Sequence, residues 1–416
     1  MHLYRAIDGQ LLRTLVARDI YESGSFGGDV TAVPPTTPGG VFGILISAHT
    51  AFVPPSPNAT GRAFLVDAQT GETRFSFQSL HETFGLNFSR EGVLGAARLG
   101  PNAEPACLVC SSDSRDAGGS VYVFAADDGE LLHQFVNPLP QYRDYGYVVA
   151  LMPDLTGDGI EEILISFSAE RLGPAPTDIG TVYVYSGSTW EQLMRIPHRA
   201  FAMAGLPDIT GDGVPDIALG NQVEPPSDLP EYAGVVRMIS GATGEVFATL
   251  TAPQPQQYGA FGASIGAARD LDHDGVADLV VSEHGAFYPE FRDPVGQVHV
   301  FSGASLLPLR TIRHPFPANG SGFGGRLLPI PDCNGDGIDE VAISAGNDWP
   351  GQNGRPRQAY IFLSCPADWD ADGEATAADF FGFLNSFFSL DQYADFNRDG
   401  LVNSQDFFDY LSAFFA

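Results

Sequence analysis

Short apolar runs recur along the chain, and each is bounded by glycine, proline or small polar residues. Runs of this kind, rich in β-branched and aromatic residues, predict β-strands. A Phe-Gly step opens each unit, as at Phe261-Gly262 and Phe323-Gly324, and is followed by a first strand, a loop and a second strand. A third strand, a glycine turn and a short last strand complete the unit. The third strands are predicted at 63–66, 121–124, 182–185, 235–239, 298–301 and 359–363.

Units of about 60 residues with four strands each predict an all-β fold, a β-propeller of six to seven four-stranded blades. We expect the propeller to occupy residues 1–364, with an N-terminal hairpin at 1–19 and blades from about 20 to 364. The run 11–16 can complete the last blade and close a ring of six. Alternatively, the chain starts within a blade of a seven-bladed ring, with a signal peptide upstream, and we favour this second alternative.

One loop carries the clearest candidate chemistry, because carboxylates stand at its positions 1, 3, 5 and 9 and a glycine at position 6 allows a sharp turn. Such carboxylates, together with a main-chain carbonyl at position 7, can converge on one hard cation. Calcium suits this arrangement because it takes six to eight oxygen ligands in irregular geometry. The residues are Asp270, Asp272, Asp274, Val276 (through its carbonyl) and Asp278, with Gly275 at the turn.

The blades resemble the FG-GAP repeats of integrin α-chain propellers and their bacterial relatives over roughly residues 20–364. The resemblance implies a calcium loop between the first and second strands of a blade, and four blades match it. We expect structural ions that neutralise the carboxylates and fix the turn, and no metal at 34–40 or 99–105. Besides 270–278, the matching residues are Asp154, Thr156, Asp158, Ile160, Glu162; Asp208, Thr210, Asp212, Val214, Asp216; and Asp332, Asn334, Asp336, Ile338, Glu340.

The composition changes at Cys365, where two loops with EF-hand-like spacing begin, each leading into a near-copy of one phenylalanine-rich helix. Position 12 of each loop is aspartate. This duplicated unit at 365–416 resembles a dockerin module, which implies calcium-dependent folding and docking onto a cohesin-type receptor, often in secreted bacterial proteins. The candidate ligands are Asp368, Asp370, Asp372, Glu374 and Asp379 in the first loop, and Asp395, Asn397, Asp399, Leu401 and Asp406 in the second.

The two predicted helices carry more aromatic surface than a two-helix module can bury. Phe380, Leu384 and Phe387 form one stripe on the first helix, and Phe381 and Phe388 form another. Either the second stripe packs on the propeller, or it is a partner surface, since exposed apolar patches usually mark binding sites.

Charge excludes two classes of partner. The net charge is −30, from 51 acidic residues against 21 basic ones, and the basic residues are all arginine. Binding to a nucleic-acid backbone or to anionic lipid requires positive charge, so neither is expected. No segment has the length and apolar purity of a membrane span. We expect about six calcium sites, counting four in the propeller and two in the tail.

The cysteines give one firm prediction and one alternative. Cys107 and Cys110 have a spacing that can indicate zinc or redox chemistry. The residues around them form a strand, however, where an offset of three places two side chains on opposite faces, so we expect core cysteines. Cys333 and Cys365 would follow strands at the same edge of the last blade, and a disulfide between them would imply an oxidising compartment.

No pattern of catalytic residues stands out. The first strands, which line the channel of a propeller, are small and apolar at 95–97, 148–151, 203–205 and 264–268, and the nine histidines form no ligand-type pair. We therefore expect a secreted or cell-surface, non-catalytic calcium-binding protein. Its propeller would present a ligand face, and its tail would attach to a protein partner. The alternative is a polysaccharide-active hydrolase or lyase, because dockerin-like tails are often carried by such enzymes.

Overall fold

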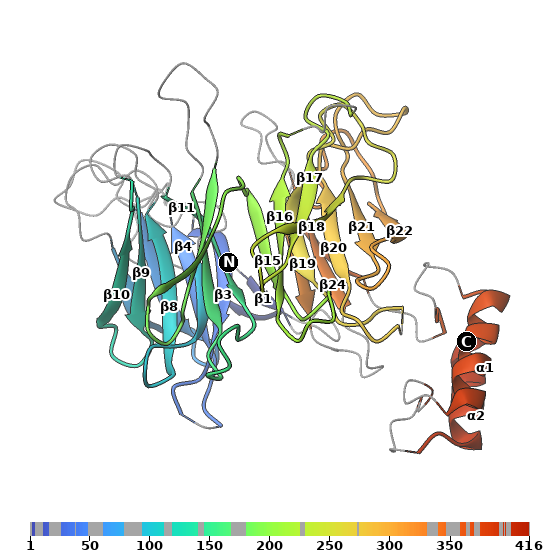
Figure 1. Cartoon of the computed structure of the whole chain (residues 1–416), viewed down its shortest axis with the longest axis horizontal. Helices are drawn as coiled ribbons and strands as arrows, with labels where there is room; N and C mark the ends of the chain where they lie inside the picture. The colour runs from blue at the N-terminus through green and yellow to red at the C-terminus, as the bar shows by residue number, and fades with distance from the viewer. Residues whose placement is uncertain are drawn as a thin grey trace. The chain divides into compact units, whose positions relative to one another are not determined.

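The structure is a computed structural model that describes most of the propeller strands and both C-terminal helices (Figure 1). The chain divides into two compact units, which are considered separately: 1–205 with 214–219 and 238–247, and 206–213 with 220–237 and 248–416. The described residues are 2–4, 11–15, 26–37, 39–48, 61–78, 94–111, 119–139, 145–167, 180–224, 229–272, 274–330, 340–346, 358–362, 367–369, 375–390, 394, 396 and 401–415.

Six sheets follow one another along the chain, and in each the hydrogen-bonded neighbours are also neighbours in sequence. This is the blade topology of a β-propeller. The first unit holds blade 1, β3 (Phe26–Val33), β4 (Gly43–Ala48), β5 (Arg62–Asp67) and β6 (Thr73–Phe77); blade 2, β7 (Leu94–Leu99), β8 (Glu104–Ser111), β9 (Ser120–Ala125) and β10 (Leu131–Val136); and blade 3, β11 (Tyr145–Met152), β12 (Glu162–Phe167), β13 (Thr181–Tyr185) and β14 (Gln192–Ile196).

The residues of blade 4 are divided between the two units, and the second unit holds the remaining blades. Every predicted third strand is confirmed, by β5, β9, β13, β17, β21 and β25. Blade 4 has β15 (Ala202–Leu206), β16 (Asp216–Asn221), β17 (Val235–Ile239) and β18 (Val246–Leu250); blade 5 has β19 (Phe261–Ala267), β20 (Leu279–Glu283), β21 (Gln297–Phe301) and β22 (Pro308–Arg313); blade 6 has β23 (Leu327–Ile330), β24 (Glu340–Ala345) and β25 (Gln358–Phe362).

The N-terminal hairpin contradicts one of the two alternatives left open by the sequence. β1 (His2–Tyr4) and β2 (Leu11–Thr14) pair only with each other among the described strands, so the alternative in which 11–16 completes the last blade is wrong. Leu15 is instead buried in a cluster with Ile46 and Phe64 of blade 1. The Arg13 guanidinium donates a hydrogen bond to the carbonyl oxygen of Gln69 at 2.7 Å. The described residues contain six blades rather than the favoured seven, and the sixth shows three strands.

The Phe-Gly step produces the same bulge in several blades. The ladder register shifts between Phe26 and Val30, between Tyr145 and Val149, and between Phe261 and Ile265. Gly262 illustrates the requirement for glycine, because its φ is +81° and a Cβ there would lie 2.7 Å from the carbonyl oxygen of Val235. Bulges of this kind bend a strand and leave a backbone group without its ladder partner.

A serine on the second strand accepts a backbone N–H near the start of the first strand in four blades, three of which have this bulge. The Ser282 hydroxyl accepts the N–H of Ser264 at 2.8 Å, and Ser166 accepts that of Val148 at the same distance. Because an unpaired buried N–H would be costly, these hydroxyls stabilise the bulge. In the same way, the Ser47 hydroxyl accepts the backbone N–H of Asp29 at 2.7 Å, and the Ser344 hydroxyl accepts that of Arg326 at 2.8 Å.

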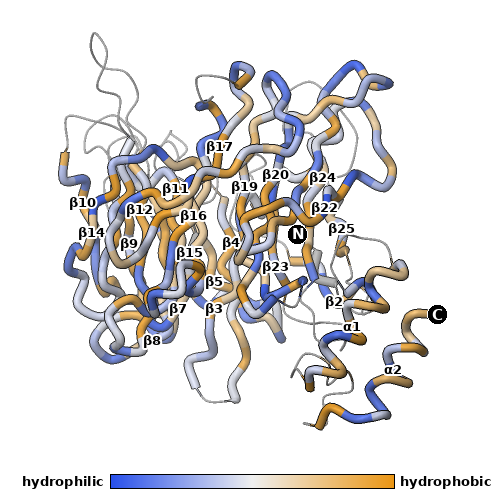
Figure 2. The backbone as a smooth tube through the Cα atoms, turned by 45° about the vertical axis from the view of Figure 1, so that its right-hand side comes forward, coloured by the Kyte–Doolittle hydropathy of each residue, from blue (hydrophilic) through white to orange (hydrophobic). Residues whose placement is uncertain are grey.

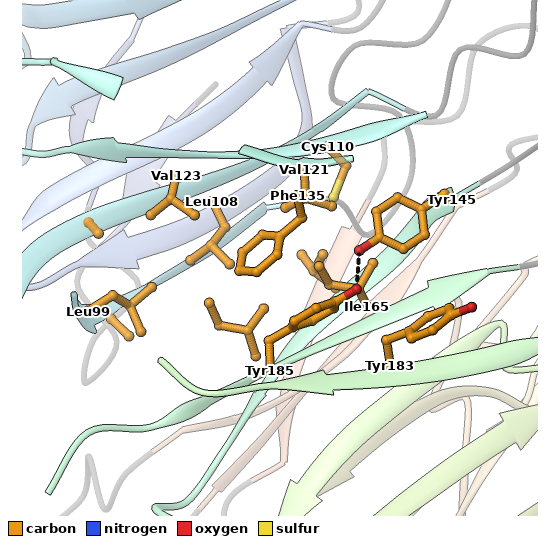
Figure 3. Packing of buried hydrophobic residues seen from close by; sticks show 14 of the residues in the cluster. Leu99, Leu108, Cys110, Val121, Val123, Phe135, Tyr145, Ile165, Tyr183 and Tyr185 are labelled. Atoms are coloured by element: carbon orange, nitrogen blue, oxygen red, sulfur yellow. Dashed lines mark hydrogen bonds between the residues drawn. The ribbon is translucent and has the colours of Figure 1, made fainter. Parts of the chain in front are cut away.

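Blades 2 and 3 share a core of aliphatic and aromatic side chains (Figure 3). Leu108 and Val123 of blade 2 belong to the same buried cluster as Ile165 of blade 3. The Tyr145 hydroxyl donates to the Tyr185 hydroxyl at 3.0 Å, so the polar end of one buried ring is satisfied by the other (Figure 3).

The two cysteines of β8 confirm the prediction from strand geometry. Both are free and fully buried. Cys107 belongs to the core on the side of blade 1, with Phe77, whereas Cys110 belongs to the core shared with blade 3. Since the thiols point to opposite faces, they cannot form a joint zinc or redox site. Cys333 and Cys365 lie outside the described residues.

The C-terminal segment forms two helices, α1 (Ala377–Ser389) and α2 (Ser404–Phe414). Both begin with a capping box, in which Thr376 or Asn403 caps the helix and an aspartate three residues later bonds back. The rings of Phe383 and Tyr410 stack between the helices, with centroids 4.0 Å apart. Figure 2 shows orange, apolar stretches on both helices. Neither α1 nor α2, the helices of the described chain, is long and apolar enough to cross a membrane.

Candidate metal centre

Three carboxylates converge in the loop between β19 and β20 of blade 5. Oxygens of Asp270, Asp272 and Asp278 all lie within 4.8 Å of one another. Calcium–oxygen distances are about 2.3–2.6 Å, so oxygens that share one ion lie at most about 5 Å apart. Asp278, directly before β20, is fully buried, and the other two are half-buried. The three side chains therefore fit a single calcium ion.

The electrostatics of this cluster favour a cation. Burial raises the pKa of Asp278 to about 7, and the charges of Asp272 and Asp270 add to the rise. Burial likewise raises the pKa of Asp272 to about 6, with the charges of Asp274 and Asp270 contributing. Grouped buried carboxylates resist ionisation because each charge is poorly solvated and repels the next. A bound divalent cation would remove both penalties.

The backbone of the loop wraps around its first carboxylate. Asp270 Oδ1 accepts the N–H of Asp274 at 3.0 Å, and Oδ2 accepts the N–H of Gly275 at 2.8 Å. The φ of Gly275 is +93°, which glycine adopts without strain. The position-1 carboxylate thus fixes the turn, and the turn directs the alternating side chains to one side.

A second element holds the last carboxylate. Asp278 Oδ1 accepts the N–H of Gly303, in the turn after β21, at 2.9 Å, while Oδ2 accepts the N–H of Leu271 at 2.6 Å. A Cβ on Gly303 would overlap the carbonyl oxygen of Ala277, so only glycine allows this approach. The buried carboxylate is therefore oriented by two backbone donors before any ion is bound.

The aspartate at position 5 of the loop, Asp274, was predicted as a ligand but does not join the converging carboxylates. Asp274 is exposed and lies outside the converging group. Its carboxylate accepts the hydroxyl of Ser302 at 3.0 Å and the N–H of Val276 at 2.9 Å. The structure thus brings together three of the four predicted carboxylates of this loop.

The loop between β11 and β12 repeats this construction. Asp154 accepts four backbone N–H groups, and although burial opposes the effect, these bonds lower the pKa of its carboxyl. Glu162 Oε1 accepts the N–H groups of Leu155 and Thr156 at 3.0 and 3.1 Å. The other oxygen, Oε2, is buried with no hydrogen-bond partner. Burial, with the charge of Asp154 adding, raises the pKa of Glu162 to about 7. A buried carboxylate oxygen without a donor is the environment that a metal ion would satisfy.

The position-5 side chain of this loop also follows the pattern of blade 5. Asp158 accepts the hydroxyl of Ser188, from the turn after β13, and the N–H of Ile160 at 2.9 Å. The serine-containing turn after the third strand therefore contacts the same loop position in both blades.

In blade 4 the start of the loop has the same shape. Asp208 Oδ1 accepts the N–H of Gly211 at 2.7 Å, and Oδ2 accepts that of Gly213 at 2.7 Å. The bond from Gly213, with those from Gly211 and Asp212, lowers the pKa of Asp208. The buried Asp216 Oδ1 accepts the N–H of Gly241 at 3.0 Å, as Asp278 does from Gly303.

The other predicted sites are only partly described. In blade 6, Glu340 is fully buried, while Asp332, Asn334, Asp336 and Ile338 lie outside the described residues. In the tail, Asp379 and Asp406 are fully buried and act in the capping boxes, where Asp379 accepts the N–H of Thr376 at 2.6 Å and Asp406 that of Asn403 at 2.8 Å. Asp368 is buried and Leu401 is exposed; Asp370, Asp372, Glu374, Asp395, Asn397 and Asp399 lie outside the described residues.

Two contributors to the sites were missed by reasoning on the loops alone. In blade 5 the Ser-Gly turn after the third strand supplies the Ser302 hydroxyl to the position-5 aspartate and the Gly303 N–H to the position-9 carboxylate. In blade 4 the Gly241 N–H reaches the position-9 carboxylate of Asp216 in the same way. The signal was present in the sequence, since Ser-Gly recurs at 186–187, 240–241 and 302–303. It was assigned only to turn formation because the partner loop is 25 residues away in sequence.

Comparison with known proteins points to the same blade. The FG-GAP repeat model matches residues 261–301, which contain β19, the converging loop, β20 and β21. The chain is 29% identical over 167 residues to human integrin alpha-10, covering 37% of this chain and 14% of that protein. It is 30% identical over 229 residues to human integrin alpha-IIb, covering 50% of this chain and 20% of that protein. It is 29% identical over 198 residues to integrin alpha-PS3 of Drosophila melanogaster, covering 44% and 17%.

Among solved structures, the Dos1 propeller aligns with 76% of this chain and 64% of its own, at a TM-score of 0.44 and 12% identity, too distant to inform function. The matches span at most a fifth of the integrin chains named above. Within those limits the predicted FG-GAP resemblance is confirmed for one blade: residues 261–301 match the FG-GAP repeat, and the chain is similar to integrin α chains.

Proposed function

We propose that this chain is a calcium-binding, non-catalytic protein of the cell exterior, with a propeller that binds a protein ligand and a tail that attaches to a partner. The observation that carries the proposal is the convergence of Asp270, Asp272 and Asp278 within an FG-GAP repeat. Similarity to integrin α chains supports a role in protein interaction and an extracellular location.

Calcium in this proposal is structural. Asp270, Asp272 and Asp278 would hold the ion of blade 5, whose charge would offset three grouped carboxylates. The chain orients these groups in advance through the N–H donors of Gly275, Gly303 and Leu271. The ordered loop then fixes the connection between the first and second strands, so the neighbouring loops can present a defined surface.

The same construction supports further sites. In blade 3, Asp154 and the unpartnered Glu162 oxygen form the corresponding pair. Blades 4 and 6 and the two tail loops bring the expected number to about six. Six divalent ions would change the formal charge from −30 to about −18, which lowers the self-repulsion of the folded chain.

The tail is the proposed attachment element. Its loops match a dockerin-like pattern, and the position-12 residues Asp379 and Asp406 are buried at the helix starts, where a bound ion and the helix cap would act together. A cohesin-type receptor is one candidate partner, and the exposed aromatic residues of α1 and α2 are the proposed contact.

Capture with the full-length chain as bait tests this function. The immobilised chain is exposed to a cell-surface extract in calcium and in chelator, and retained proteins are identified by mass spectrometry. We expect a partner that is retained only in calcium. Equal retention in both conditions, or release of sugars from a polysaccharide panel by the purified chain, would contradict a non-catalytic, calcium-dependent binder.

A further inference from the structure

The tail exposes four phenylalanines that its own fold does not cover. Phe381 and Phe388 of α1 are 63% and 77% exposed, and Phe408 and Phe415, in α2 and directly after it, are 58% and 80% exposed. Each pair is spaced by seven residues, which places both rings on one side of the helix. The half-buried Leu384 and Leu411 lie between these rings and the stripe that packs helix on helix, so each leucine borders the exposed pair of its own helix.

The two helices are related by an internal two-fold axis. Residues that correspond in the duplicated sequence differ by 27, so Phe380 corresponds to Phe407 and Phe387 to Phe414. The rings of Phe380 and Phe414 lie 5.9 Å apart, and those of Phe387 and Phe407 also lie 5.9 Å apart. Each contact is the image of the other when the helices are exchanged. Phe383 and Tyr410, which correspond to each other, stack at the axis.

This symmetry places all four exposed rings on one face. The ring pairs show that the helices run antiparallel, because the start of α1 meets the end of α2. A two-fold axis that exchanges two antiparallel helices is perpendicular to the plane that contains them. The rotation therefore leaves each face of the helix pair, here called a flank, in place, so corresponding residues of α1 and α2 lie on the same flank. Trp369 packs against Gly382 and Phe383 on one flank. Phe381 and Phe388 lie about 100° around the helix from Phe380 and Phe387, on the other flank.

The exposed rings and the leucines between them carry no charge. Neither helix contains lysine or arginine, and Asp379 and Asp406 are buried in the capping boxes. Asp409, which accepts a hydrogen bond from Gln405 at 2.8 Å, lies about 100° around α2 from Phe408. Two copies of a chain with net charge −30 repel each other over most of their surfaces. An uncharged apolar face is therefore where a second copy can approach, and it offers no charged groups with which a basic or acidic partner could pair.

The area also suits self-association. The exposed fractions of the four rings, at about 200 Å² for each side chain, give roughly 550 Å² of aromatic surface. With the flanking leucines this approaches the roughly 800 Å² per partner of a standard interface. A two-fold dimer buries the same patch on both copies, so each ring contributes twice.

We infer that this face, Phe381, Leu384 and Phe388 with Phe408, Leu411 and Phe415, docks against the same face of a second copy, so that two tails form a four-helix bundle. The inference rests on the proposed attachment role of the tail and names its partner. Helices in such bundles need an apolar stripe wide enough to contact two neighbours, which α1 and α2 have. The dimer would carry two propellers and raise their avidity for a repeated ligand.

Sedimentation of the full-length protein in calcium over a range of concentrations tests the inference. We expect a monomer–dimer equilibrium, and we expect Phe388→Gln and Phe415→Gln each to weaken dimerisation by at least about tenfold, because each change occurs twice in the dimer. Phe316→Gln is the matched control, since Phe316 is 75% exposed and lies outside the tail. Circular dichroism of each variant confirms that the helices remain folded. As a second measurement, differently tagged copies of the parent should co-purify.

Each other outcome overturns the inference. A parent that stays monomeric at concentrations well above those of typical homodimers excludes self-docking, and so does a dimer that persists in both tail variants. If the parent is monomeric but still captures a distinct partner in calcium, self-docking of the tail is wrong and the proposed function is retained. If the parent is monomeric and captures no protein, both self-docking and the proposed function are contradicted.

Discussion

Replacing Asp278 with asparagine distinguishes a metal ligand from a carboxylate that only supports the fold. Without calcium, the Asp278 carboxylate is buried beside two others, and its pKa is raised from 3.8 to about 7. A shift of this size corresponds to about 4 kcal/mol against the ionised form. At about pH 8, where the group is ionised in both the folded and the unfolded states, asparagine removes that cost.

The same substitution has a local penalty. Asp278 accepts N–H groups of Leu271 and Gly303 on its two oxygens, whereas asparagine has one acceptor oxygen. One buried N–H loses its partner, which costs about 1–3 kcal/mol. The balance predicts that, in chelator, the variant is more stable than the parent by about 1–3 kcal/mol.

In calcium we expect the parent to be more stable than Asp278→Asn, the reverse of the order in chelator. An ion at about a thousand times its dissociation constant stabilises the folded state by about 4 kcal/mol, and the variant loses this at blade 5. The assay is thermal unfolding of parent and variant in chelator and in excess calcium, with Asp293→Asn as control because Asp293 is half-buried outside the loops. Equal destabilisation of Asp278→Asn in both conditions would refute the reasoning, since it would make the carboxylate a purely structural acceptor.

Three further predictions concern other parts of the chain. Gly303→Ala, whose Cβ would overlap a carbonyl oxygen of the neighbouring loop, should lower stability by about 2–4 kcal/mol in calcium and in chelator alike; an unchanged melting temperature would contradict it. The hydrogen bond from Arg74 holds the pKa of Asp67 at about 2, so its stabilising effect is present above about pH 4 and is lost as pH falls through about 2. Parent and Asp67→Asn should therefore differ by about 1–2 kcal/mol at neutral pH and converge in acid, as followed by fluorescence. Burial raises the pKa of the Cys110 thiol well above its usual value, so a thiol reagent at neutral pH should label it only after unfolding; labelling of the native protein would show that the strand opens.

Much of the blade architecture follows from the sequence because its signals are local and repeated. The Val-Tyr-Val-Phe-like runs are buried strands with a fixed distance to the Phe-Gly step, and the structure places β21 at Gln297–Phe301 where 298–301 was predicted. The cysteine pair in β8 was interpreted correctly for the same reason, since side-chain direction along a strand alternates whatever surrounds it.

The parts that the sequence did not predict depend on contacts between distant segments. The hairpin β1–β2 was assigned from its strand pattern, but its position follows from Leu15 packing with Phe64 and from Arg13 bonding to Gln69, which no local pattern reveals. In the blade 5 loop, spacing alone made Asp274 equivalent to Asp272. In the structure Asp274 lies outside the converging group, and its carboxylate accepts the hydroxyl of Ser302, 28 residues further along the chain, a contact that spacing within the loop does not reveal.

Calcium counting by native mass spectrometry of the full-length chain tests the central claim most directly. The chain is stripped with chelator, re-equilibrated with calcium, and compared with Asp278→Asn and with the control Asp293→Asn. The account predicts several calcium ions for each parent chain, one fewer in Asp278→Asn and no loss in the control. A parent that binds no calcium, or an Asp278→Asn variant that binds the full number, would contradict it.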